Sequence, residues 1–183
     1  DNLLNVMYNP NLYPQRKSNA DGDIVAMSAV NFYEGVTKAE AEAFYAAMVD
    51  PNDKTPISYG LNSRLVKGED GKIYEDVYKI GGLYGPALEK ICAELELAAA
   101  VAQNDSQKKY IASLVNYYRT GDLKLWDEYN IEWVKDTLGT IDFVNGFVED
   151  YNDPLGRKAN WEGNVNIKDV KASQRTAILS ANA

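Results

Sequence analysis

The segment at residues 146–163 reads GFVEDYNDPLGRKANWEG and predicts two strands joined by a turn. Upstream of the turn, apolar and polar residues alternate with a period of two over 141–151, which is typical of a strand. Residues 152–156 (NDPLG) combine the residue types that favour turns. A second strand is expected over 161–167, so this part of the chain predicts a hairpin-like β segment.

Glu149 and Tyr151 fall on one face of the expected first strand, about 7 Å apart. A carboxylate there can bind the ammonium group of a peptide, and a phenol can donate a hydrogen bond to an oxyanion. The same residues can equally form a strand-end pair satisfied by the Arg157 and Lys158 side of the turn, because buried polar groups are usually paired. Spacing alone favours this structural interpretation, and turn geometry alone explains Asp153.

The rest of the chain predicts one further hairpin and several helices. Thr37, with Glu40 three residues later, forms a capping box that begins a short helix ending before Asp50. Two partly alternating stretches, 57–67 and 72–80, flank GEDG and predict a hairpin. Apolar residues at three- and four-residue steps, with capping residues between them, predict helices at 86–102, 105–120, 122–139 with a possible break near 129–130, and from 169 onward.

Together these patterns predict an α+β fold that is mainly helical and contains two β-hairpin-like segments. Residues 1–58 form a loop-rich lead-in with one short helix, extended over 1–35. The first residues lack an initiator methionine and a signal-peptide pattern, so we expect an excised piece of a longer protein.

Composition excludes several classes of partner. The 183 residues carry 19 basic and 27 acidic side chains, a net charge of -8, which argues against nucleic acid and anionic membranes as partners. No apolar run approaches the roughly 20 residues that span a bilayer. The single cysteine, Cys92, lies in an apolar helical stripe and is expected to be a buried structural thiol.

Common catalytic motifs are absent from the sequence. The chain has no histidine, no HExxH and no CxxC motif, so it cannot assemble an ordinary zinc site, and we expect no metal bound to it. The serines have no histidine to activate them, and no phosphate-binding glycine loop is present.

The residues 146–163 resemble the segment of dipeptidyl-peptidase III enzymes that reads Gly-Phe-aliphatic-Glu-x-Tyr-x-Asp-Pro-hydrophobic-Gly, followed by aromatic-Glu-Gly. YYRTGD at 117–122 and LNSRLVKGEDGKIYE at 61–75 support the match. The resemblance implies a two-lobed zinc exopeptidase that removes dipeptides from the N-termini of short peptides. In such an enzyme, a wide cleft separates a mainly helical zinc lobe from a lobe that contains a small β-barrel.

The resemblance also implies roles for three residues. Glu149 matches the carboxylate that receives the substrate's N-terminal ammonium, and Tyr151 matches the catalytic tyrosine that stabilises the transition state. Glu162 matches a further acid of the substrate-binding cleft. The family's HExxGH zinc motif lies further along the chain and has no counterpart here, so zinc belongs to the full-length enzyme and this piece alone is expected to be inactive.

By the same resemblance, residues 59–167 belong to the barrel-containing lobe, and 168–183 begin a helix that leads toward the zinc lobe. The implied partners are short peptide substrates and the remaining zinc lobe of the same polypeptide, and the implied location is cytoplasmic. Two alternatives stay open: an acidic, aromatic-rich, non-enzymatic binding module for peptides or glycans, and an interaction domain with no small-molecule site.

Overall fold

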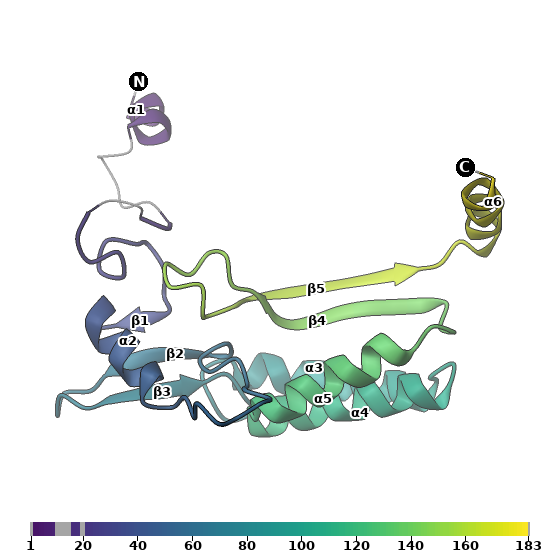
Figure 1. Ribbon diagram of the computed structural model, residues 1–183, viewed down its shortest axis with the longest axis horizontal. Helices are drawn as coiled ribbons and strands as arrows, with labels where there is room; N and C mark the ends of the chain where they lie inside the picture. The colour runs from purple at the N-terminus through teal and green to yellow at the C-terminus, as the bar shows by residue number, and fades with distance from the viewer. Residues whose placement is uncertain (1, 10–15, 19–20, 183) are drawn as a thin grey trace.

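The computed structural model describes residues 2–9, 16–18 and 21–182 and has the expected mixed α+β composition (Figure 1). Parts of the predicted lead-in, residues 1, 10–15 and 19–20, lie outside the described residues, as does residue 183. The helices are α1 (Asn2–Tyr8), α2 (Lys38–Ala46), α3 (Gly85–Ala100), α4 (Asp105–Thr120), α5 (Leu123–Lys135) and α6 (Val170–Ala181). The strands are β1 (Tyr33–Glu34), β2 (Ser63–Lys67), β3 (Ile73–Val77), β4 (Ile141–Glu149) and β5 (Asn160–Ile167).

The strands form two small sheets. In the first, β2 pairs antiparallel with β3 and parallel with the short β1. In the second, β4 and β5 form a long antiparallel ribbon. Both predicted hairpin-like segments are therefore confirmed, whereas the two sheets are not joined into a closed barrel within the described part of the chain.

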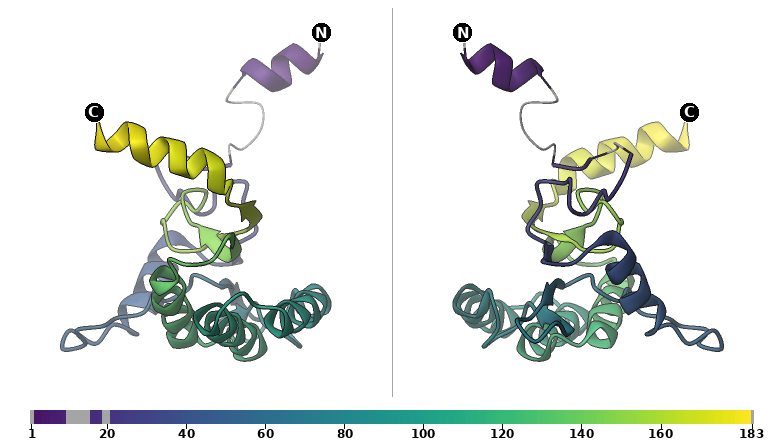
Figure 2. Two further views of the ribbon diagram at one scale, coloured as in Figure 1. Left: turned by 90° about the vertical axis from the view of Figure 1, so that its right-hand side faces the viewer. Right: turned by 90° about the vertical axis from the view of Figure 1, so that its left-hand side faces the viewer.

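Helices α3, α4 and α5 form a layer on one side of the β4–β5 ribbon (Figures 1 and 2). The side chain of Asn104 accepts a hydrogen bond from the Gln107 backbone and caps α4, which ends at Gly121 in the left-handed region with φ of 74°. The side chain of Asp122 accepts from the Lys124 backbone and caps α5. These caps confirm the predicted start and end of α4 and the predicted start of α5, because each satisfies a backbone group that the helix end leaves unpaired.

The predicted end of α5 at Gly139 and the possible break near 129–130 are wrong. The helix is continuous from Leu123 to Lys135, and the side-chain amide of Asn130 donates to the Trp126 carbonyl at 2.8 Å inside it. It ends at Lys135, after which the carboxylate of Asp136 accepts hydrogen bonds from the next backbone amides and holds the chain in a turn.

The larger core lies between this helical layer and the ribbon. It contains Leu88 and Cys92 of α3, with Cys92 only 4% exposed, so the predicted buried thiol is confirmed and burial raises its pKa. Gly146 of β4 lies against α5: a Cβ there would be 2.5 Å from Cη2 of Trp126. Glycine at this position therefore lets the ribbon approach the helix.

A smaller core joins α2 to the first sheet and includes Ala41, Tyr45 and Leu65. The capping box of Thr37 and Glu40 is present at the start of α2, as predicted. The extended lead-in is wrong over Asn2–Tyr8, which is helical. The apolar residues 3, 4, 7 and 8 follow the three- and four-residue steps of a helix, a pattern that the abundant Asn and Pro nearby obscured.

Beyond the far end of β5, helix α6 extends away from the helical layer (Figure 1). Large apolar side chains remain exposed there, at Val165, Ile167, Ile178 and Leu179. No helix among the described residues is both long and apolar enough to cross a bilayer.

Candidate functional site

The candidate site lies at the turn end of the β4–β5 ribbon. Phe147 pairs with Trp161, but the next pair is Glu149 with Asn160, so the register shifts by one residue between these pairs. Such a bulge adds a residue to one strand and re-aims the side chains beside it. Glu162, which pairs with Gly146, lies on the opposite strand of the same ribbon end.

Glu149 pairs with Asn160, and Glu162 follows Asn160 by two residues on β5, so the two acids are diagonal neighbours on the ribbon, and both are half-buried. Hydrogen bonding with Glu162 raises the pKa of Glu149, and partial desolvation and the charges of Glu162 and Asp150 act in the same direction. Oε1 of Glu162 also accepts a hydrogen bond from the Asn164 side chain at 3.2 Å. Two adjoining carboxyls either share a proton or bind a cation, because two unscreened negative charges repel each other. An ammonium group is suited to this place.

Tyr151 lies at the same end of the ribbon but outside the strand. The prediction that β4 continues to Tyr151 is wrong: the strand ends at Glu149, and Asp153 donates a backbone hydrogen bond to the Asp150 carbonyl that closes a turn. The expected separation of about 7 Å between Glu149 and Tyr151 assumes that both residues lie in one strand, so it does not apply. The Tyr151 side chain is 64% exposed and free to meet a ligand.

The structural interpretation, in which the Arg157 and Lys158 side of the turn satisfies Glu149 and Tyr151, is also wrong. The guanidinium of Arg157 donates to the Tyr59 carbonyl at 3.0 Å and lies 4.5 Å from the ring centroid of Tyr45. Lys158 is fully buried and turns toward the first sheet. Both cations are thus engaged with distant parts of the chain.

Asp153 has a larger role than its turn position predicts. It is fully buried, and Oδ2 accepts from the Tyr33 hydroxyl at 2.9 Å and from the backbone amides of Arg157 and Lys158 at 2.8 and 2.9 Å. Sequence reasoning missed Asp153 and Lys158 as buried charges. A lysine after an arginine in a turn is typical of the surface, and no local signal marks partners that lie far away in the sequence.

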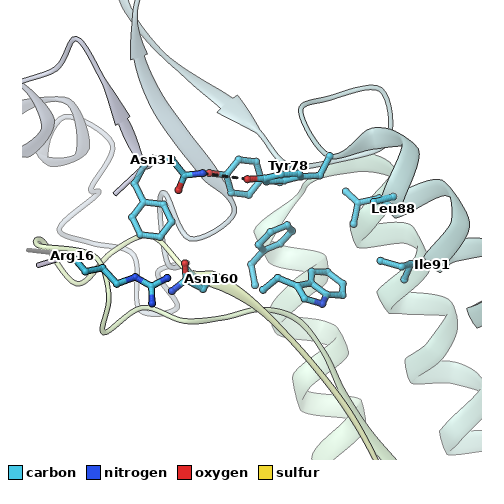
Figure 3. A pocket seen from close by; sticks show the side chains of 12 residues that line it. Arg16, Asn31, Tyr78, Leu88, Ile91 and Asn160 are labelled. Atoms are coloured by element: carbon cyan, nitrogen blue, oxygen red, sulfur yellow. Dashed lines mark hydrogen bonds between the residues drawn. The ribbon is translucent and has the colours of Figure 1, made fainter. Parts of the chain in front are cut away.

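A cavity of about 490 Å³ lies between the start of β5 and α3 (Figure 3), and neither Glu149 nor Glu162 is among its lining residues. Asn160, the strand partner of Glu149, lies at one end beside Arg16, and Leu88 and Ile91 of α3 lie at the other. The aromatic residues that line it are Phe32, Tyr78, Tyr84, Phe147 and Trp161. The lining is mostly apolar with a few polar groups, as in sites for small organic ligands.

The described residues do not fit a zinc ion. No group of three or more His, Cys, Asp or Glu side chains among them is arranged to hold a metal, and the whole sequence lacks histidine. The contact of Glu149 with Glu162 supplies only two carboxyls, without the nitrogen or sulfur ligands that zinc prefers.

Comparison with known proteins identifies the family. The family model described as peptidase family M49 matches residues 33–183. The chain belongs to peptidase family M49. The match contains the whole ribbon, the acid pair and the buried Asp153 and Lys158, and it confirms the resemblance carried by residues 146–163.

Individual M49 relatives agree with this assignment. Rat dipeptidyl peptidase 3 is 31% identical over 102 residues, which cover 55% of this chain and 14% of the rat protein. Dipeptidyl peptidase 3 from Dictyostelium discoideum is 29% identical over 111 residues, covering 59% of this chain and 16% of that protein. The chain thus matches only about a seventh of the length of these relatives.

Two solved structures share the fold. Dipeptidyl-peptidase III from Corallococcus sp. strain EGB superposes with a TM-score of 0.60 at 25% identity, and DPP III from Caldithrix abyssi with 0.62 at 27% identity. In each case the match covers 82% of this chain and 27% of the other.

Proposed function

We propose that this M49 chain forms one wall of the peptide-binding cleft of a zinc-dependent peptidase that releases dipeptides from the N-termini of short peptides. The observation that carries the proposal is the placement of Glu149 and Glu162 on adjacent strands at the turn end of the ribbon, with the exposed Tyr151 in the turn that follows Glu149. Such an acid pair favours a cation, and the free N-terminus of a peptide supplies one.

Each of the three residues has a distinct role in the proposed reaction. Glu149 binds the α-ammonium of the substrate through a charge-assisted hydrogen bond, and Glu162 adds a second acceptor for the same group. Binding of the ammonium also relieves the repulsion between the two carboxylates. The Tyr151 hydroxyl donates to the carbonyl oxygen of the scissile bond as negative charge develops there.

The remainder of the polypeptide supplies what this chain lacks. Residues outside 1–183 would hold the zinc ion, which would supply a Lewis acid for the scissile carbonyl and for an attacking water. We place residues 59–167 in the barrel-containing lobe and 168–183 in a helix that leads toward the zinc lobe, with 1–58 as the lead-in to the first. The remaining partners are short peptides, and the proposed location is cytoplasmic.

Mass spectrometry of peptide digests tests this function. The full-length zinc-loaded protein, incubated with a short peptide, should release dipeptides in order from the N-terminus, and a zinc chelator should stop the release. Release of single amino acids, or internal cleavage, would overturn the proposal. Tight peptide binding without cleavage would instead support the non-enzymatic binding module.

A further inference from the structure

The buried ammonium of Lys158 links the candidate site to the first sheet. The side chain has no exposed surface, and Nζ donates to the Ser63 carbonyl at 3.0 Å, to the Gly60 carbonyl at 3.3 Å and to the Tyr45 hydroxyl at 2.6 Å. The Ser63 hydroxyl lies a further 3.1 Å from Nζ. These acceptors come from α2, from β2 and from the turn before β2, so one side chain joins three segments.

The charge of Lys158 is balanced through two hydroxyl groups. Oε1 of Glu75, on β3, accepts from the Ser63 hydroxyl at 2.6 Å and from the Tyr45 hydroxyl at 2.9 Å. The Tyr45 hydroxyl and the Ser63 hydroxyl thus each bridge the Glu75 carboxylate and the Lys158 ammonium. A buried charge is tolerated when it is paired and hydrogen-bonded in this way.

Charged groups of its own segment and an aromatic ring of β1 also lie around Lys158. The carboxylate of Asp153 accepts a hydrogen bond from the backbone amide of Lys158, and Arg157 directly precedes Lys158 in the chain. The centroid of the Tyr33 ring lies 5.6 Å from Nζ of Lys158. Desolvation lowers the pKa of Lys158 to about 8, although Glu75 and Asp153 act in the opposite direction. The ammonium is therefore the main form at neutral pH.

Lys158 stands at the start of the strand that carries Glu162. Ala159 donates its backbone N–H to the Leu61 carbonyl at 2.9 Å, and Asn160 then pairs with Glu149. The anchoring of Lys158 and Ala159 therefore determines where β5 begins relative to β4. The separation of the Glu149 and Glu162 carboxyls depends on that register.

We propose that Lys158 is a positioning residue: its buried ammonium fixes the start of β5 on the first sheet and thereby aligns Glu149 and Glu162 for binding a peptide ammonium. The proposal rests on the proposed function for the role of the acid pair. Lys158 has no exposed surface and touches no substrate, so it acts through these two residues. Small displacements of a binding group cost catalytic efficiency steeply, which makes such an anchor effective.

The first test compares steady-state kinetics of the full-length protein with Lys158→Met, using a chromogenic dipeptide substrate. We expect KM to rise by about 10- to 100-fold with a smaller change in kcat, because substrate binding is what loses alignment. Ile111→Ala is the control, since Ile111 is buried in α4, which lies outside residues 150–162, and its truncation lowers stability. An equal rise of KM in Ile111→Ala would overturn the proposal.

A double-mutant cycle separates positioning from general damage. If Lys158 acts through Glu149 and Glu162, then Lys158→Met in a background that carries both Glu149→Gln and Glu162→Gln should change KM by less than about twofold. A full additional 10- to 100-fold rise in that background would contradict the proposed route.

Hydrogen–deuterium exchange of the same full-length protein tests the anchor without any activity. In Lys158→Met, amides of 153–160 should exchange at least about tenfold faster than in the wild type, while those of α4 stay unchanged. Unchanged exchange in 153–160 would refute the anchor, whether or not the wild type releases dipeptides. Absence of dipeptide release by the wild type would refute only the proposed function. If Lys158→Met does not fold, Tyr45→Phe is measured in its place. This variant removes one hydrogen-bond acceptor of Lys158 and should likewise speed the exchange of the amides of 153–160.

Discussion

Replacing Lys158 by methionine should remove a distinct pH dependence of stability. Lys158 is fully buried, and its pKa is lowered from 10.5 to about 8 in the folded chain. Between these values the unfolded chain holds a proton that the folded chain has lost, so the free energy of unfolding rises with pH. Below about pH 8 both states are protonated and the cost of burying the charge is fully present.

The size of the effect follows from the two pKa values of Lys158. Each unit of difference corresponds to about 1.4 kcal/mol, and from pH 7 to pH 9.5 the expected gain in the free energy of unfolding is about 2 kcal/mol. The upper limit of pH 9.5 stays below the ordinary titration of tyrosine. Burial raises the pKa of tyrosines such as Tyr118, so their contribution to stability is lost only at higher pH.

The assay is urea-induced unfolding of the 183-residue chain at several pH values, followed by tryptophan fluorescence. The quantity of interest is the difference between the wild type and Lys158→Met, in which contributions common to both proteins, such as that of Cys92, cancel. Lys171→Met is the matched control, because Lys171 is an exposed lysine of α6. A wild-type rise equal to that of Lys158→Met would refute a buried, desolvated ammonium at position 158.

Three further outcomes follow from the geometry. In the full-length protein, Tyr151→Phe should lower kcat by about 100-fold with little change in KM, measured with a chromogenic dipeptide substrate; an unchanged kcat would remove Tyr151 from the mechanism. The isolated 183-residue chain should release no dipeptides with added zinc, and metal-dependent release by the pure chain would contradict this. Gly146→Ala should lower the free energy of unfolding by about 1–3 kcal/mol, because the new Cβ would lie 2.5 Å from Trp126; an unchanged urea midpoint would show that the ribbon does not lie on α5.

Local signals in the sequence predicted most of the elements. The capping box at Thr37 and the capping side chains of Asn104 and Asp122 act within three residues of themselves, so their partners are visible in the sequence. The alternation over β4 and the turn residues after it likewise predicted the ribbon. The two-residue strand β1 was missed because so short a segment carries no periodicity of its own.

The detailed geometry of the candidate site depends on contacts that sequence spacing does not reveal. The bulge before Glu149 brings it to Glu162, and the turn that begins at Tyr151 takes that side chain out of the strand. Lys158 meets the Tyr45 hydroxyl across 113 residues of sequence. Because such partners come from distant segments, Lys158, which the sequence suggests is a surface residue, is buried. Likewise, the neighbour of Glu149 is the acid Glu162 and not the basic residues that were expected to pair with it.

The central claim is that Glu149 and Glu162 bind a peptide ammonium, and substrate discrimination tests it most directly. The measurement is the ratio of kcat/KM for a dipeptide substrate with a free N-terminus to that for its N-acetylated form, in the full-length wild type and in Glu149→Gln. The wild type should prefer the free substrate by at least about 100-fold, and Glu149→Gln should reduce that ratio by about 10- to 100-fold, the value of a charge-assisted hydrogen bond. Equal cleavage of both substrates by the wild type, or an undiminished ratio in Glu149→Gln, would contradict the account.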